Sequence, residues 1–266
     1  TAVLVHDMVG RSVDRLFPQI SEPSNEAKTV LSISNLSAAN GSFKNISFAI
    51  KEGEIFGIAG IIGAGRTELV RAIVGIDPIL SGEIRIHNKK LRITSPKDAI
   101  KENLVLVPDD RKALGVILAH SIAENLSYNN FDQIAPNHWV MPAKVKNFAQ
   151  LLIARLGVKG YPEQQAGALS GGNQQKVVIA KWIARNPKII ILDEPTRGID
   201  VGARAAIYTV ITELAKQGLA VIIVSSDLEE VLGLSHRVMV MSRGEMRGIL
   251  YRSEVNSAKV MALAVL

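Results

Sequence analysis

Apolar and polar positions along the chain predict strands near its beginning and end, with helices concentrated in between. Alternation over residues 30–33 and 43–50 has the two-residue period of a strand with one buried face. The run over 188–192 is apolar after its first residue, which is typical of a parallel strand buried on both faces. The predicted strands cover residues 30–33, 43–50, 55–59, 82–86, 104–107, 188–192, 219–224 and 238–241.

Helical periodicity occupies most of the middle of the chain. Strand signals thin out between about residues 115 and 185, so we expect a mainly helical subdomain inserted into a sheet core. Alternation of strands and helices resumes after it, which predicts an α/β fold with its ligand beyond the carboxyl ends of the strands. The predicted helices cover residues 68–73, 97–101, 143–156, 173–184, 202–216 and 227–234.

A glycine-rich loop follows the predicted strand at 55–59. Gly60, Gly65 and Thr67 match the phosphate-loop pattern G-x-x-x-x-G-K-[ST], but Arg66 stands where the pattern has lysine. Backbone N–H groups of such a loop wrap an anion, and the Thr67 hydroxyl can bind Mg²⁺. A guanidinium is broader than an ammonium group, so we expect nucleotide binding with slow or absent turnover. The alternative is a loop that has lost catalytic capacity and persists as a scaffold. The candidate binding residues here are Gly60, Gly63, Ala64, Gly65, Arg66, Thr67 and Glu68.

Two further motifs lie in the second half of the chain. Asp193 and Glu194 end the apolar run, where we expect Asp193 to reach Mg²⁺ through a water molecule and Glu194 is the candidate general base or water-orienting group. The alternative is that the two acidic residues only cap a helix. Pro195 and Thr196 argue against this, because they continue a motif longer than a helix cap. Upstream, a Ser170-Gly171-Gly172 turn opens the predicted helix at 173–184 and offers a hydroxyl and backbone N–H groups to an anion. An ordinary helix cap is the alternative there.

In this order and spacing, the motifs resemble the ATP-binding domain of an ABC transporter, and within that family the second ABC half of a sugar-importer ATPase. The likeness extends from about Val30 to the end and is carried by residues 63–69, 108–112, 170–176 and 195–202. It implies a P-loop NTPase core with a mostly parallel sheet, an antiparallel β subdomain and an inserted helical subdomain. It also implies ATP and Mg²⁺ as cofactors. Residues 1–27 would be the tail of a preceding ABC half and a linker, and residues 28–266 the nucleotide-binding domain.

Compared with that family, the chain departs at positions that matter for catalysis. Asp109 replaces the glutamine that follows the strand at 104–107, and Ser226 replaces the histidine that follows the strand at 219–224. By resemblance, both positions are candidate nucleotide-binding residues. Phe43 is the nearest aromatic residue that could support adenine, but we expect it in the core. The chain's own site is therefore expected to be impaired, whereas Ser170 and Gly172 would, by resemblance, serve the nucleotide held by the partner half.

Composition limits the cellular compartment and the classes of partner that we expect. The chain has 266 residues, no cysteine and a net charge of +6 with scattered Lys and Arg, which fits a reducing compartment and argues against a nucleic-acid partner. No apolar stretch approaches the ~18 residues that span a bilayer, and no secretory signal is evident. We expect Trp139 and Trp182 to pack in the core or subdomain.

The resemblance implies several partners. They are the N-terminal ABC half of the same polypeptide, membrane permease subunits near residues 109–125 and, indirectly, a periplasmic solute-binding protein. The chain would lie at the cytoplasmic face of the inner membrane as a peripheral protein. The solute would be ribose, galactose or an autoinducer-type sugar. A regulatory nucleotide-sensing domain and an ABC ATPase outside transport, acting on ribosomes or DNA, are the competing functions.

Overall fold

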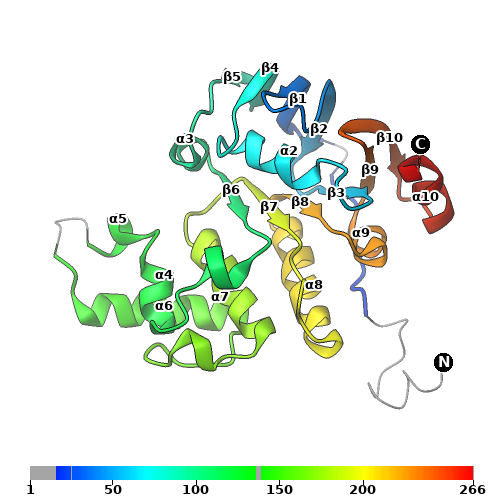
Figure 1. The fold of residues 1–266 in the computed structure, drawn as a ribbon. Coiled ribbons are helices and arrows are strands. Elements are labelled where there is room, and N and C mark those ends of the chain that lie inside the picture. Colours follow the sequence, from blue (N-terminus) through cyan, green and yellow to red (C-terminus); the bar gives the residue numbers. More distant parts are fainter. Residues whose placement is uncertain (1–15, 25, 136–138, 266) are drawn as a thin grey trace, which may run out of the picture. The chain divides into compact units, whose positions relative to one another are not determined.

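The computed structural model describes residues 16–24, 26–135 and 139–265. It divides into two compact units (Figure 1). Among the described residues, the sheet unit contains those within 17–106, 188–195 and 211–265, and the helical unit contains those within 107–187 and 196–210. The sequence also allows a short helix over residues 3–9, broken at Gly10, and these residues lie outside those that the structure describes.

The first sheet of the sheet unit is antiparallel and four-stranded, in the order β2-β1-β4-β5. β1 pairs with β2 on one side and β4 on the other, and its Leu31 and Ile33 are buried. This alternation of buried and exposed positions is the pattern that predicted strands here. The bounds are β1 Thr29–Ala38, β2 Ile46–Lys51, β4 Ile79–Ile86 and β5 Lys89–Leu91.

The second sheet has the order β10-β9-β3-β8-β7-β6. β3 pairs in parallel with both β8 and β9, and β8 pairs in parallel with β7, while β10 runs antiparallel to β9. Every residue of β7 and β8 is buried, as expected for parallel strands covered on both faces. The bounds are β3 Ile55–Gly60, β6 Leu104–Val107, β7 Ile189–Asp193, β8 Ala220–Val224, β9 Arg237–Ser242 and β10 Glu245–Tyr251.

Four helices complete the sheet unit. α2 (Arg66–Ile73) follows β3, and its Leu69, Val70 and Ile73 enter a core shared with both sheets. α9 (Leu228–Leu234) and α10 (Ser257–Val265) contact β3, and α10 also contacts β9 (Figure 1). α3 (Pro96–Lys101) begins at Ser95, which caps it. A longer helix, α8 (Val201–Lys216), starts in the helical unit and ends in the sheet unit.

The helical unit is built from α4, α6 and α7, which contact one another. A capping box begins α4, in which the Ser121 hydroxyl accepts from the Glu124 N–H at 3.1 Å and the Glu124 carboxylate accepts from the Ser121 N–H at 2.7 Å. The bounds are α4 Ile122–Ser127, α5 Phe131–Ile134, α6 Pro142–Leu156 and α7 Gly171–Ile183, with a π-helical turn η2 at Arg111–Gly115 and a 3₁₀ turn η3 at Ala166–Ala168.

The predicted fold class is confirmed, and so is each predicted helix and strand, with shifted ends. The second predicted strand begins at Ile46 rather than residue 43, and Phe43 itself is buried. Short elements were not predicted: β5, β10, α4, α5 and α10. The prediction that Trp139 packs inside is wrong, because its side chain is 83% exposed, beside exposed Val140 and Met141. Within the described parts of the chain, the structure contains no helix with the length and apolar character needed to cross a bilayer.

A buried ion pair ties β9 to the turn before β3 and predicts a large stability effect. Glu54 is 3% exposed and accepts from Arg237 Nε at 2.6 Å and Nη2 at 3.0 Å. Burial acts to lower the pKa of Arg237, but the hydrogen bond and charge of Glu54 outweigh it, so that this pKa is raised. Glu54→Ala should lower the free energy of unfolding by about 3 kcal/mol, because it leaves a guanidinium that is only 20% exposed without its carboxylate.

Urea unfolding followed by circular dichroism measures the loss. Glu83, an exposed carboxylate that pairs with Arg85 and Lys90 in the same unit, is the matched control. Glu83→Ala should leave the unfolding midpoint unchanged. Equal midpoints for the two variants would contradict the importance assigned to Glu54.

Candidate functional site

The phosphate loop connects β3 to α2 and leaves the first turn of the helix open. Gly65 is the N-cap of α2 at φ 87°, and no side chain caps the helix. Ala64 is buried, and its carbonyl accepts from the Gly244 N–H at 3.1 Å, which fixes the loop against the sheet unit. The N–H groups of the first turn therefore have no side-chain acceptor at the N-cap, which is the arrangement that binds phosphate.

Arg66 directs its charge toward the neighbouring strand ends. It is 8% exposed, its Nη1 donates to the Ser225 carbonyl, and its Nη2 lies 3.9 Å from Glu194 Oε1. Burial lowers the pKa of Arg66, and the carboxylates of Glu194, Asp193 and Glu68 act in the opposite direction. The guanidinium is thus held by protein groups at the ends of β7 and β8. Sequence reasoning missed Ser225 as its partner, because a carbonyl acceptor leaves no trace in a motif.

Thr67 and Asp193 meet as the motifs predicted. The Thr67 hydroxyl lies 3.4 Å from Asp193 Oδ1, and Asp193 is 2% exposed. A hydroxyl and a carboxylate are ligands that Mg²⁺ accepts, and neighbouring ligands of an octahedral ion at 2.0–2.1 Å lie about 3 Å apart. The two groups therefore fit one Mg²⁺ ion, and Glu68 lies next to Thr67 in the chain.

Glu194 adopts a backbone conformation that is uncommon outside glycine. Its φ is 48°, and its N–H donates to the Val224 carbonyl at 2.7 Å. Its Oε1 accepts from the Ser226 N–H at 2.8 Å, and its Oε2 accepts from the Ser226 hydroxyl at 3.0 Å. Both carboxylate oxygens are therefore engaged by a single residue at the end of β8.

Asp109 and Asp110 have other partners. Asp109 Oδ2 pairs with Arg197 Nη1 at 3.2 Å, and both residues belong to the helical unit. Asp110 caps η2 by accepting from the N–H groups of Lys112 and Ala113, and the second of these bonds is the main cause of its lowered pKa. Of the residues predicted around the nucleotide, the structure joins Arg66, Thr67, Asp193, Glu194 and Ser226 by contacts within the sheet unit.

The Ser-Gly-Gly turn begins α7 without capping it. Ser170 is the exposed N-cap residue, and its side chain makes no cap hydrogen bond. Instead its Oγ accepts from Asn173 Nδ2 at 2.9 Å, and Asn173 Oδ1 accepts from the Lys159 N–H at 2.8 Å. These contacts leave the Ser170 hydroxyl proton and the first N–H groups of a 13-residue helix available to an anion.

Arg111 is a residue whose position the sequence did not reveal. It appeared only as part of a motif, with no function assigned. Its Nη1 donates to the Arg197 carbonyl at 2.5 Å and its Nη2 to the Gly198 carbonyl at 3.0 Å. A Cβ atom at Gly171 would lie 2.9 Å from Arg111 Nη2. Arg111 thus connects the turn at 197–198 to the start of α7, all within the helical unit.

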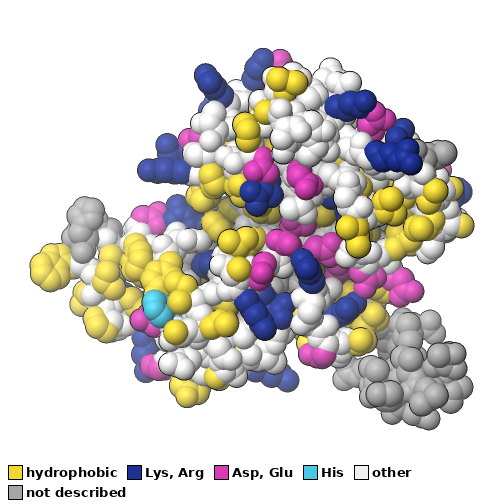
Figure 2. All heavy atoms as spheres, in the orientation of Figure 1, with side chains coloured by type: hydrophobic (Ala, Val, Ile, Leu, Met, Phe, Trp, Pro, Cys, Tyr) yellow, Lys and Arg dark blue, Asp and Glu magenta, His cyan; other side chains and the backbone are white. Residues whose placement is uncertain are grey.

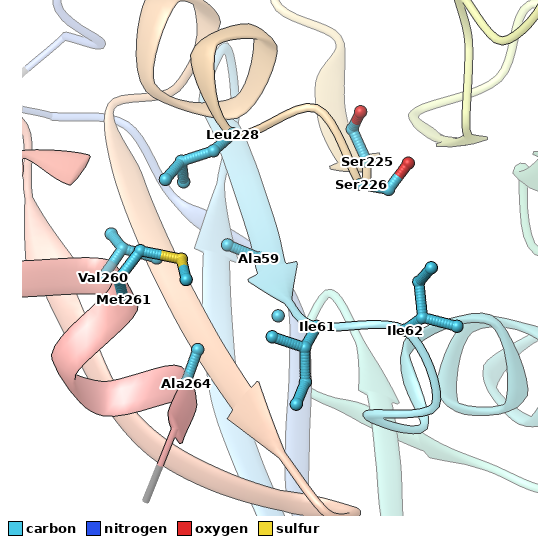
Figure 3. A pocket seen from close by; sticks show the side chains of 10 residues that line it. Ala59, Ile61, Ile62, Ser225, Ser226, Leu228, Val260, Met261 and Ala264 are labelled. Atoms are coloured by element: carbon cyan, nitrogen blue, oxygen red, sulfur yellow. The ribbon is translucent and has the colours of Figure 1, made fainter. Parts of the chain in front are cut away.

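A pocket of about 470 Å³ adjoins the phosphate loop (Figure 3). The loop residues Ile61 and Ile62 form one side, Ser225 and Ser226 another, and α10 a third through Val260, Met261 and Ala264. Its lining is mostly apolar and contains no cationic side chain, so it does not suit a phosphate group. The N–H groups that could receive an anion are those at the uncapped start of α2.

Comparison with known proteins identifies the family to which this sequence is similar. Residues 43–197 match the family model described as ABC transporter. The ribose import ATP-binding protein RbsA of Oceanobacillus iheyensis is 45% identical over 98% of this chain and 52% of its own length. An import ATP-binding protein of Rhizobium etli, named for ribose, galactose and methyl galactoside, is 44% identical over 99% of this chain and 50% of its own length. The chain thus spans about half the length of these relatives.

Solved structures share the fold. The structure titled cbiO1 from Clostridium perfringens, part of the ABC transporter complex cbiONQ, has a TM-score of 0.73 and 26% identity over 88% of this chain and 92% of that one. The ADP conformation of MJ1267, an ATP-binding cassette of an ABC transporter, has a TM-score of 0.74 and covers 90% of this chain and 99% of that one. At 21% identity it supports the fold alone.

Two glycines of the loop should respond differently to alanine. Gly65 (φ 87°) would place a Cβ atom 2.6 Å from the Ser42 carbonyl oxygen, whereas Gly63 (φ 82°) has open space around that position. Gly65→Ala should cost about 2 kcal/mol or more of unfolding free energy, and Gly63→Ala only the torsional strain of about 1 kcal/mol. Urea unfolding checks both, and equal losses would show that backbone torsion alone decides.

Proposed function

Since the chain belongs to the ABC transporter family, we propose that it is the ATP-binding domain of an importer for ribose or a related sugar, and the second of two ABC halves in one polypeptide. In this proposal the Ser170-Gly171-Gly172 turn completes the ATP site of the other half, while the chain's own site holds nucleotide with little turnover. The names of the relatives from Oceanobacillus and Rhizobium support the solute class. Their lengths, about twice that of this chain, support a second half.

The observation that carries the proposal is the uncapped start of α7. An N-cap serine ordinarily satisfies an N–H of its own helix, as Ser121 does in α4. Ser170 does not, although it is exposed and its hydroxyl is held by Asn173. A hydroxyl proton, free N–H groups and the helix dipole together suit the terminal phosphate of a nucleotide held by the other half of the polypeptide.

The chain's own site supports binding better than hydrolysis. The loop N–H groups would receive the phosphates, and Thr67 and Asp193 would hold Mg²⁺, which supplies charge neutralisation at the phosphoryl oxygens. The remaining groups favour a resting site, because Arg66 is bound to Ser225 and Glu194 is bound to Ser226. Glu194, as the candidate base, would have to break its contacts with Ser226 to reach a water molecule.

Contact with a membrane permease is the proposed reason for the apolar surface of the helical unit. Figure 2 shows hydrophobic side chains gathered over the region of α4, α5 and α6. Such a patch on a protein surface marks an interaction site. We place the permease subunits here, with the domain at the cytoplasmic face of the membrane and a solute-binding protein acting from outside. The exposed large apolar residues of this unit include Leu114, Ile117, Leu118, Tyr128, Phe131, Trp139, Val140, Met141, Leu151 and Tyr161.

Two other functions stay open to test. A purely regulatory domain would bind ATP in the reassembled protein without any effect of Ser170 on turnover. An ABC ATPase outside transport would copurify with ribosomes or DNA instead of a permease. Stimulation of ATP turnover by ribose in the complete complex favours the importer over both.

Ser170 supplies the sharpest test. In the protein that carries both ABC halves, Ser170→Ala should lower the rate of ATP hydrolysis by about 10²-fold, the effect of removing one donor to a charged transition state. Its stability should change little, because the side chain does not cap α7. A coupled phosphate-release assay measures the rate.

Ser121 is the matched control, since it is also a helix N-cap serine of the helical unit. Ser121→Ala should lower the free energy of unfolding by about 1 kcal/mol and leave ATP hydrolysis within twofold of wild type, because it breaks a capping box remote from phosphate chemistry. If Ser170→Ala hydrolyses ATP at the wild-type rate, the function proposed for the turn is wrong.

The isolated chain gives a second prediction. It should bind MgATP, as measured by calorimetry, while hydrolysing it at no more than about one hundredth of the rate of the two-half protein, because it lacks the other half's site. Rapid hydrolysis that persists when the chain is diluted would contradict the proposed division of labour.

A further inference from the structure

We propose that Glu194 is a latch that fastens the end of β7 to the end of β8 and to Arg66, and that it does not serve as a base. The inference rests on the proposed function, in which the chain's own site does not hydrolyse ATP. It explains why the acidic residue of the motif is present in a site that lacks the family's lysine and histidine. In this proposal the function of the carboxylate is to bind Ser226 and Arg66.

The contacts of Glu194 are those of a structural group. Its two oxygens accept separately from the N–H and the hydroxyl of Ser226, at 2.8 and 3.0 Å. Its own N–H donates to the Val224 carbonyl at 2.7 Å, so that backbone and side chain both bind the end of β8. A positive φ of 48° in a residue with a Cβ atom persists only where the surroundings fix it.

Arg66 closes the network on the other side. Its guanidinium donates to the Ser225 carbonyl and lies 3.9 Å from Glu194 Oε1, with side chains 8% and 14% exposed. Arg66 is the first residue of α2, directly after the phosphate loop. The Glu194 carboxylate therefore joins three segments: the end of β7, the Ser225–Ser226 turn and the start of α2. A base must turn toward water, and turning here would break two hydrogen bonds and an ion pair.

Glutamine separates a latch from a base. Its Oε1 can accept from the Ser226 N–H while its Nε2 donates to the Ser226 hydroxyl, because a hydroxyl both donates and accepts. Glu194→Gln therefore keeps both bonds to Ser226, but loses the ion pair with Arg66 and the proton-accepting carboxylate. Glu194→Ala loses everything. A latch tolerates glutamine, whereas a base tolerates neither variant.

Amide hydrogen exchange on the two-half protein, read by mass spectrometry, tests the latch directly. Glu194→Ala should speed exchange about tenfold in the peptides that contain Ser226 and Arg66, and Glu194→Gln should leave exchange at Ser226 within twofold of wild type. Glu229, an exposed carboxylate of α9 in the same unit, is the control, and Glu229→Ala should change exchange in neither peptide.

Ser226 provides a milder variant in case Glu194→Ala does not fold. Ser226→Ala removes only the hydroxyl bond and should speed exchange about threefold, and Ser226→Thr, which retains a hydroxyl, should restore it. The latch is overturned if Glu194→Gln speeds exchange at Ser226 as much as Glu194→Ala does, or if Glu194→Ala leaves that exchange unchanged. Failure of the proposed function would be distinct, because it would appear as normal turnover in Ser170→Ala.

Discussion

Parallel pairing of β8 between β3 and β7 is the constraint on which the candidate site of the sheet unit depends. The three strands point the same way, so their carboxyl ends share one edge and deliver the phosphate loop, the Asp193-Glu194 pair and the Ser225-Ser226 turn to one place. Full burial of β7 and β8 makes this register costly to change, because a slip would expose continuous apolar strands. The chemistry of the site is therefore positioned by the hydrophobic core.

Charge at this edge is balanced inside the protein. A buried guanidinium needs acceptors in place of water, and Arg66 finds a carbonyl and a carboxylate. The ordinary lysine of a phosphate loop is a slender point charge that can extend along the loop toward phosphate. Exchanging it for arginine therefore changes the direction of the charge as well as its shape. The replacement of lysine by Arg66 is therefore connected with the position of the Glu194 side chain, which lies 3.9 Å from the guanidinium.

The sequence predicted the helices and strands that have a regular pattern of apolar residues. The period of β1, the apolar runs of β7 and β8 and the long helices α6, α7 and α8 were all predictable, because burial imposes their patterns. Short elements such as β5, α4 and α5 were missed, since a few residues carry too little periodicity. Trp139 was misplaced because its neighbours are apolar too, and a run of apolar residues does not reveal which face is buried.

Within the candidate site, the motifs predicted that Thr67 would meet Asp193. They could not predict that Arg66 would turn to the Ser225 carbonyl or that Ser226 would bind Glu194, since these contacts depend on the exact approach of two strand ends. Asp109, in contrast, has a partner in the structure that its motif did not predict. Its place in a motif suggested a nucleotide contact, yet in the structure it forms an ion pair with Arg197, which no local pattern announces.

The first turn of α7 has no side-chain cap. Its N-cap side chain is turned to Asn173, so part of the hydrogen bonding that a helix normally obtains from its own sequence is left to an outside group. An anion that arrives there therefore does more than occupy a surface, because it supplies the missing acceptor. Binding of an anion there would then also order the first turn of the helix.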